Sequence, residues 1–261
     1  MEGISAIINT YNEADLLEDC IKSIKGFADE IIVGDMMSID QSAEIARRMG
    51  CMVISYPPQQ IVEQTFLTRL YKTSNEWILM FDPDNRLPEI TAARLKDIVK
   101  NNEADVVQFF YRTKIFGKFI KHGHASGGCQ ARFFKKSILL KNGEPEIKIH
   151  SMVYLPLKKN TERWITLDRK YYIEHLAYDN IHKCFEQHLR YARIEADERY
   201  NRGDRFNFFK MTYEVLKKIV ADFFYRFAWL SGIRGIIYSF IAELMILQIH
   251  LFLWDKKRSG N

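Results

Sequence analysis

The sequence lacks several patterns that would assign it to a familiar class. Its four cysteines form no Cys-x-x-Cys pair and are widely spaced, at Cys20, Cys51, Cys129 and Cys184. A disulfide framework or a cysteine-rich zinc site is therefore not expected. No charged and then apolar leader opens the chain, so we expect a cytoplasmic protein with free thiols. Neither Gly-x-Gly-x-x-Gly nor a Walker sequence occurs, which argues against a dinucleotide enzyme and a P-loop nucleotide hydrolase.

Charge is distributed unevenly along the 261 residues. Residues 205–261 contain nine Lys or Arg against four Asp or Glu, so this tail accounts for the whole net charge of +5. The tail also holds 13 of the 35 aromatic residues. A basic, aromatic-rich end on a neutral body indicates a surface for anionic lipid rather than for nucleic acid. With 47% hydrophobic residues, the chain can bury the core of one large domain, with or without an appendage.

One apolar run, Trp77–Phe81, is followed at once by Asp82 and Asp84. Five consecutive apolar residues predict a strand buried on both faces, at the centre of an α/β sheet. Ligands bind at the carboxyl ends of such strands, so the two carboxylates could share a divalent cation, Mg²⁺ or Mn²⁺. The alternative is a turn around Pro83 in which both carboxylates accept backbone N–H groups.

Strands and helices alternate from the first residues onward. We predict strands at 3–9, 30–34, 51–55, 77–81 and 105–110, with helices at 16–26, 40–48, 60–73 and 88–99 between them. This alternation predicts a βαβ series and a parallel sheet. From about residue 180 the pattern is helical, with helices expected at 181–201, 205–230 and 235–254.

Polar side chains follow three of these strands. They are Thr10, Tyr11 and Glu13 after the first, Asp35 after the second, and Asp82 and Asp84 after the central one. In a parallel sheet these ends lie at one edge, so the side chains should converge. Asp35 could accept a hydrogen bond from the imide N–H of uracil, and Tyr11 could stack on the base.

Three segments, Ala6–Glu13, Asp29–Asp40 and Trp77–Asp84, together resemble the family 2 inverting glycosyltransferases of GT-A fold. Tyr111–His122 and Arg132–Lys135 resemble the branch that adds glucose in β-1,4 linkage to the lipopolysaccharide inner core, as does the helical tail. The resemblance implies a Rossmann-like, mostly parallel sheet with helices on both faces and a helical extension. It implies a GT-A domain at 1–178, with a nucleotide half to about 105 and an acceptor half at 106–178, and an extension at 179–261.

The same resemblance implies a metal-dependent hexosyltransferase at the inner face of the cell membrane. It would move a hexose, most readily glucose, from a UDP-sugar to a lipopolysaccharide-type or lipid-linked glycan. Thr10, Tyr11, Glu13 and Asp35 would hold the uridine, Asp82 the ribose or the metal, and Asp84 the Mn²⁺ or Mg²⁺ ion. We expect Asp40 to cap a helix instead of binding a ligand.

The chain departs from the family pattern at several positions. Asp82-Pro83-Asp84-Asn85 replaces Asp-Ala-Asp-Glu, and Phe66-Leu67 stands where an Arg-Asn pair is usual. Gly127-Gly128-Cys129 replaces a segment with an aspartate, and His150-Ser151 replaces His-Glu. The last change removes the expected general base, so another group must take the acceptor proton.

Glu146 and His150 are the first candidates for that base, with Glu144 in reserve. Solvated loop charges are an equal alternative for each. These departures also motivate a second hypothesis, a catalytically degraded relative that serves as a nucleotide-binding or scaffolding subunit.

Two further features are left open by the sequence. Lys114, Lys118, Lys121 and Arg132 could bind phosphate of the donor or acceptor, or form a solvated face, while His175 ends a predicted strand and could face the acceptor. The helix at 235–254 is long enough to cross a bilayer, but it carries Glu243, Gln248 and His250. Polar groups are costly at the bilayer centre, so it should lie in the membrane interface or pack as core.

Overall fold

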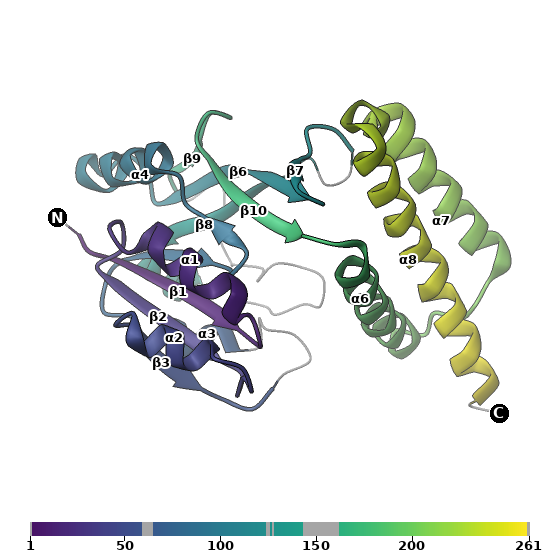
Figure 1. Cartoon of the computed structure of the whole chain (residues 1–261), viewed down its shortest axis with the longest axis horizontal. Coiled ribbons are helices and arrows are strands. Elements are labelled where there is room, and N and C mark those ends of the chain that lie inside the picture. Colours follow the sequence, from purple (N-terminus) through teal and green to yellow (C-terminus); the bar gives the residue numbers. More distant parts are fainter. Residues whose placement is uncertain (1, 59–64, 124–125, 127, 143–161, 260–261) are drawn as a thin grey trace. The chain divides into compact units, whose positions relative to one another are not determined.

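The structure is a computed structural model of the chain (Figure 1), and it describes residues 2–58, 65–123, 126, 128–142 and 162–259. The chain divides into two compact units, which are described separately. The sheet unit comprises residues 1–111 and 128–175, and the helical unit comprises residues 112–127 and 176–261. The predicted α/β fold with a helical C-terminal region is confirmed. The domain boundary at residue 178 stays a prediction.

Four parallel strands form the first half of the sheet. They lie in the order β3 (Met52–Ser55), β2 (Glu30–Asp35), β1 (Ile4–Thr10) and β4 (Trp77–Phe81). The strands predicted at 3–9, 30–34, 51–55 and 77–81 are therefore present, each within one residue of its expected bounds.

The second half of the sheet is mixed and mainly antiparallel. β8 (Cys129–Lys135) runs antiparallel to both β4 and β6 (Val106–Ile115), and β9 (Trp164–Thr166) pairs with β6 in parallel. β10 (Tyr172–Tyr178) pairs antiparallel with the short β5 (Asn85–Arg86). The expected parallel pairing thus holds for the first four strands and for β6 with β9. Antiparallel pairs enter because β8, a later segment of the chain, lies beside β4.

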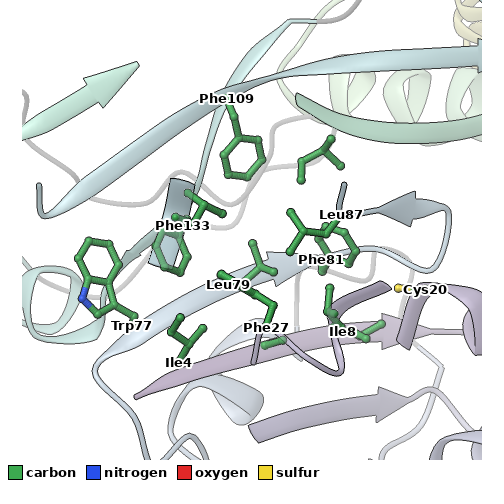
Figure 2. Close-up of a cluster of buried hydrophobic side chains, with 14 of the residues drawn as sticks. Ile4, Ile8, Cys20, Phe27, Trp77, Leu79, Phe81, Leu87, Phe109 and Phe133 are labelled. Atoms are coloured by element: carbon green, nitrogen blue, oxygen red, sulfur yellow. The ribbon is translucent and has the colours of Figure 1, made fainter. Parts of the chain in front are cut away.

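Helices cover both faces of this sheet. α1 (Ala14–Ile24), α2 (Ser42–Arg48) and α4 (Glu89–Asn101) contribute to one buried cluster, and α3 (Phe66–Leu70) and α5 (Lys136–Asn142) to the other. Figure 2 shows the first cluster, in which the ring of Trp77 stacks on Phe133 with centroids 4.6 Å apart. The helix predicted at 60–73 is described only as α3, since residues 59–64 lie outside the described chain.

The central strand β4 explains why two clusters exist. All five of its residues are buried, and successive side chains point to opposite faces of a strand. Trp77, Leu79 and Phe81 therefore join one cluster, and Ile78 and Met80 the other. The predicted burial on both faces is confirmed.

The helical unit is built on α6 (Ile181–Asn201), α7 (Phe208–Val220) and α8 (Gly232–Ser259), and it also contains β7 (Lys118–Phe119). α8 packs against both α6 and α7 (Figure 1). Its Ile249 and Leu253 are buried against Ala192 and Ala196 of α6, where small side chains allow the helices to approach closely. The helix predicted at 181–201 has the observed bounds of α6.

The helix predicted at 205–230 is interrupted. α7 ends at Val220 and continues as a π-helical turn, η2 (Ala221–Tyr225), and a 3₁₀ turn, η3 (Ala228–Ser231). Phe227 between them has a left-handed φ of 51°, a conformation that ends a helix. Asp222 in η2 is fully buried and pairs with Lys218 and with Arg226, the latter at 2.7 Å.

α8 is longer than predicted, and one of its faces is core. By length and composition alone it could cross a membrane, and 39% of its most apolar window is buried within the protein. The side of α8 that faces α6 packs as core, while Phe240, Leu244, Leu251 and Trp254 are exposed. A place for α8 in the membrane interface stays a prediction.

Candidate active site

The ends of β1, β2 and β4 lie at one edge of the sheet. Thr10 of β1 is the register partner of Asp35 of β2. Ile8 of β1 is the partner of Phe81 of β4, which directly precedes Asp82. The parallel register thus aligns the three polar strand ends.

The loops that follow β1 and β2 are tied together. The N–H of Asn12 donates to the Ser38 hydroxyl at 3.0 Å, and the N–H of Ile39 donates to the Asn12 side-chain oxygen at 2.8 Å. Asp35 Oδ1 accepts from the N–H of Ser38 at 3.1 Å. Asn12 and Met37 have left-handed φ values of 55° and 54°, which turn the two loops toward one another. Asp35 is therefore buried and held in place.

Glu13 and Asp40 act mainly on backbone groups in these loops. Glu13 Oε2 accepts from the N–H of Tyr11 at 3.3 Å and lies 3.5 Å from the Thr10 hydroxyl. Asp40 accepts from the N–H groups of Ala14, at the start of α1, and of Ser42, at the start of α2. Although partial burial opposes it, hydrogen bonds from Ser42 and Ala14 lower the pKa of Asp40. These bonds support the capping role expected for Asp40.

A buried polar network underlies the same edge, and the sequence analysis missed it. The Arg69 guanidinium donates to Asn9 Oδ1 at 2.6 Å, to the Tyr56 hydroxyl at 2.6 Å and to the Thr65 hydroxyl at 2.7 Å. Tyr56 also bonds to Asn9. A signal was available: Gly34 lies inside β2, and a glycine within a strand often marks the close approach of another group. A Cβ on Gly34 would lie 2.2 Å from the Tyr56 hydroxyl.

Each of the two carboxylates after β4 contacts a basic side chain. Arg132 Nη2 lies 3.5 Å from Asp82 Oδ2, and His175 Nε2 lies 3.1 Å from Asp84 Oδ2. The second contact arises because β5 follows Asp84 directly and pairs with β10, with Asn85 opposite His175. These partners are side chains rather than backbone N–H groups of the turn, which favours a functional site over a purely structural turn around Pro83.

The surroundings of His175 are polar and partly buried. Burial alone would lower its pKa, but the charges of Asp84 and Asp82 and the hydrogen bond to Asp84 outweigh this effect, so the pKa of His175 is raised. The ring of Tyr111 meets His175 edge-on, with centroids 6.0 Å apart. The Tyr111 hydroxyl is buried and has no hydrogen-bond partner within the described residues, and burial raises its pKa. It remains a neutral donor beside the carboxylates.

Within the described residues, no group of three or more His, Cys, Asp or Glu has the arrangement of a complete metal site. Mg²⁺ and Mn²⁺ do not need one, because they bind through one or two carboxylates together with substrate phosphates. Asp82 and Asp84 are partly exposed, with 40% and 27% of their side-chain surface accessible, so their oxygens could bind such an ion. The donor set therefore fits a hard divalent cation that arrives with a diphosphate.

The other predicted residues belong to different units or lie outside the described part of the chain. Lys114 lies in the helical unit, opposite Phe119 in the β6–β7 pairing, together with the exposed Lys118 and Lys121. Arg132 belongs to the sheet unit, beside Asp82. The candidate bases Glu144, Glu146 and His150, with Ser151 and Gly127, lie outside the described residues.

Sequence comparisons give a consistent result. A family model described as glycosyl transferase family 2 matches residues 5–164, more than half of the chain. An uncharacterized glycosyltransferase of Rickettsia felis is 26% identical over 253 residues, covering 92% of this chain and 86% of that relative. One from Rickettsia conorii is 24% identical over 284 residues, covering 100% of this chain and 97% of the relative.

Solved structures add a likeness of fold. TarS of S. aureus aligns with a TM-score of 0.51 and 16% identity, over 75% of this chain and 39% of TarS. A glucosyl-3-phosphoglycerate synthase from Mycobacterium tuberculosis, solved with Mn²⁺ and UDP-glucose, aligns with a TM-score of 0.37 and 25% identity, over 42% of this chain and 44% of that one. This chain thus spans less than half of either solved protein, and only the TarS alignment bears on the fold.

Proposed function

Because the chain belongs to glycosyl transferase family 2, we propose that it is an inverting, metal-dependent hexosyltransferase that uses a UDP-sugar, with glucose the first choice. The acceptor would be a lipopolysaccharide-type or lipid-linked glycan at the inner face of the cell membrane. The observation that carries this proposal is the alignment of Thr10, Asp35 and Asp82 at one edge of the sheet. That edge is where α/β sheets bind nucleotides.

On the donor side, Asp35 would accept the imide N–H of uracil, and Tyr11, which is 41% exposed, would stack on the base. Thr10 and Glu13 would complete the uridine site. Support comes from the rigid loop pair that holds Asp35. A fixed acceptor at Asp35 would favour uracil over cytosine and adenine, whose corresponding ring nitrogens carry no N–H.

Asp82 and Asp84 would hold the Mn²⁺ or Mg²⁺ ion, with Asp82 also within reach of the ribose. When bound, the ion would supply positive charge to the leaving diphosphate. Arg132 would add its guanidinium on the same side, since it lies beside Asp82 and suits phosphate. Lys114 stays a candidate for phosphate or acceptor binding.

Glu146 and His150 remain the proposed candidates for the general base, with Glu144 in reserve. His175 was expected to end a strand and to be able to face the acceptor. Its hydrogen bond to Asp84 favours a role in positioning that carboxylate over one at the acceptor. An inverting transferase needs its base on the acceptor side of the sugar ring.

The proposal is tested by UDP release from a panel of UDP-sugars, measured with and without Mn²⁺, because donor hydrolysis requires no knowledge of the acceptor. We expect release to be fastest with UDP-glucose and to stop when the metal is chelated. Asp84→Asn should lower turnover by roughly 10²-fold or more, while Asp97→Asn, an exposed carboxylate on α4, should not. Turnover of Asp84→Asn within about threefold of the parent would contradict the metal assignment.

The alternative, a degraded relative that only binds nucleotide, is favoured by Gly127-Gly128-Cys129 and Ser151. It makes a different prediction for the same assay. Such a protein would bind UDP and Mn²⁺ but release no UDP from any sugar donor.

A further inference from the structure

α7 presents an apolar side that no described part of the chain covers. None of its 13 residues is buried. Phe209, Tyr213, Leu216 and Val220, with Phe224 in η2, recur every three or four residues and so form one stripe along the helix, here called the α7 stripe. Their exposed fractions run from 44% at Val220 to 83% at Phe209. An uncovered apolar stripe of this length is typical of a binding surface.

The turn that follows α7 adds a second apolar group, here called the tip: Tyr225, Trp229, Leu230 and Ile233, each at least half exposed. The tip is firmly built. The Trp229 indole N–H donates to the Phe223 carbonyl at 3.2 Å, and the Ser231 hydroxyl donates to the His122 carbonyl at 3.0 Å. These apolar side chains are therefore held outward by a fixed backbone and not by a frayed end.

Close packing at the base of the tip also fixes its backbone. Arg234 donates to the Phe116 carbonyl at 2.8 Å, and a Cβ on Gly235 would lie 2.3 Å from the Ala228 carbonyl oxygen. Glycine at 235 thus lets α8 approach η3. The buried Asp222, paired with Lys218 and Arg226, fixes the π-helical turn that links the stripe to the tip.

The charge around this surface indicates its partner. Lys210 and Lys217 are exposed beside the stripe. Lys210 pairs with Asp204 at 3.3 Å, and Lys217 lies 5.9 Å from the centroid of the Tyr213 ring. Residues 205–233, which include the stripe and the tip, hold five Lys or Arg against two Asp or Glu, a net charge of +3. Lys256, Lys257 and Arg258 lie in the last turn of α8. Aromatic rings with neighbouring lysines and arginines characterise helices that lie at the headgroup level of anionic membranes. A neutral protein partner would not require that excess of positive charge.

We propose that the α7 stripe and the tip dock on the headgroup layer of a membrane that contains anionic lipid, with α7 lying in the membrane plane. This inference rests on the proposed function, because a lipid-borne acceptor gives the enzyme a reason to bind there. It assigns the contact to α7 and the tip, whereas α8 beyond Ile233 supports them by packing against α6 and α7.

Flotation of the full-length protein with phosphatidylcholine vesicles, with and without phosphatidylglycerol, tests the proposal. We expect binding to the anionic vesicles, loss of that binding at high salt because exposed charges are screened, and little binding to the neutral vesicles. The double variant Phe209→Ser/Phe224→Ser should weaken the binding by about tenfold or more. Ile90→Ser is the matched control, since Ile90 is 52% exposed on α4 of the sheet unit; it should bind as the parent does.

A second variant, Lys210→Glu/Lys217→Glu, tests the charge with the apolar stripe intact. It should also weaken binding to anionic vesicles. Full binding by the Phe209/Phe224 variant, or equal binding of the parent to neutral vesicles, would overturn the proposal. So would a dimeric parent that ignores vesicles and becomes monomeric in that variant, because the stripe would then be covered by a second copy of the chain.

UDP release measured on the same proteins separates the two proposals. If the parent releases UDP normally but does not bind vesicles, only the proposed membrane docking is overturned. Normal vesicle binding without UDP release overturns the transferase proposal and leaves the docking surface supported.

Discussion

At Gly34 a single added carbon should disturb the nucleotide end of the sheet. A Cβ there would lie 2.2 Å from the Tyr56 hydroxyl and 2.8 Å from Arg69 Cδ. Gly34→Ala should therefore displace the network around Asn9, next to Asp35. With one or two net hydrogen bonds of about 1 kcal/mol disturbed, the KM for the UDP-sugar should rise by roughly tenfold, and kcat should change less.

Gly26→Ala is the matched control, because a Cβ at Gly26 meets no atom within 4 Å. Its KM should stay at the parent value. If Gly34→Ala kept the parent KM as well, the network would have no part in donor binding.

Some residues of the site could be predicted from the sequence and others could not. Thr10, Asp35, Asp82 and Asp84 follow apolar strands, so local pattern was enough to find them and to expect them at one edge. The partner of Asp84 was hidden, because His175 is 91 residues away in the chain. Only the pairing of β5 with β10 brings the two together, and that pairing is a property of the folded sheet.

Asp105 joins three strands of the sheet unit. It precedes β6, accepts from the side chain and the N–H of Arg163 just before β9, and lies 3.3 Å from Lys135 of β8. The hydrogen bonds from Arg163, opposed by partial burial and aided by Lys135, lower the pKa of Asp105 from 3.8 to about 2. The carboxylate is therefore favoured in the folded state.

A pH dependence follows. The ionised Asp105 stabilises the folded state fully at pH values above its usual pKa of about 3.8, and this stabilisation is lost as the pH falls toward 2. Asp105→Asn should destabilise the protein near neutral pH by about 1–2 kcal/mol, the lower figure allowing for solvent screening of Arg163. The difference in the free energy of unfolding between Asp105→Asn and the parent, measured by denaturant unfolding, should become smaller below pH 4. Asp97→Asn should have the same free energy of unfolding as the parent. A difference that persists unchanged to pH 2 would exclude this ion pair as its cause.

The two faces of α8 can be compared with two leucines. Leu253 is 1% exposed and packs on α6, and Leu251 is 49% exposed. Leu253→Ala should destabilise the helical unit by about 2–4 kcal/mol through the cavity it leaves, and Leu251→Ala by less than about 0.5 kcal/mol. Thermal unfolding followed by circular dichroism measures both. Equal effects would mean that α8 is not anchored on α6.

Strands and helices whose bounds depend on the local sequence pattern were predicted. Features that depend on pairing with distant segments were not. The parallel strands β1, β2, β3 and β4 and the helix α6 were predicted close to their observed bounds. The antiparallel insertion of β8 beside β4 could not be read from its own residues, since orientation depends on the chain between them. The prediction of one helix at 205–230 was wrong, because the apolar residues continue through Phe227 although the backbone turns there.

At the scale of the whole molecule, chemistry and charge occupy different parts of the chain. The candidate donor site lies within the sheet unit, whose strand ends supply Thr10, Asp35 and Asp82. The excess positive charge and the exposed apolar stripe lie in the helical unit. This separation predicts that donor hydrolysis and vesicle binding can be removed independently by substitutions in one unit or the other.

Calorimetric titration of UDP, with and without Mn²⁺, tests most directly whether the three strand ends form one donor site. In the parent, Mn²⁺ should increase the affinity for UDP, because Asp82 and Asp84 hold the ion against the diphosphate. Asp84→Asn should abolish that increase and keep the metal-free affinity, whereas Asp35→Asn should weaken UDP binding to a similar degree in both conditions. If Asp35→Asn binds UDP as the parent does, or Asp84→Asn keeps the full Mn²⁺ effect, this edge of the sheet is not the donor site.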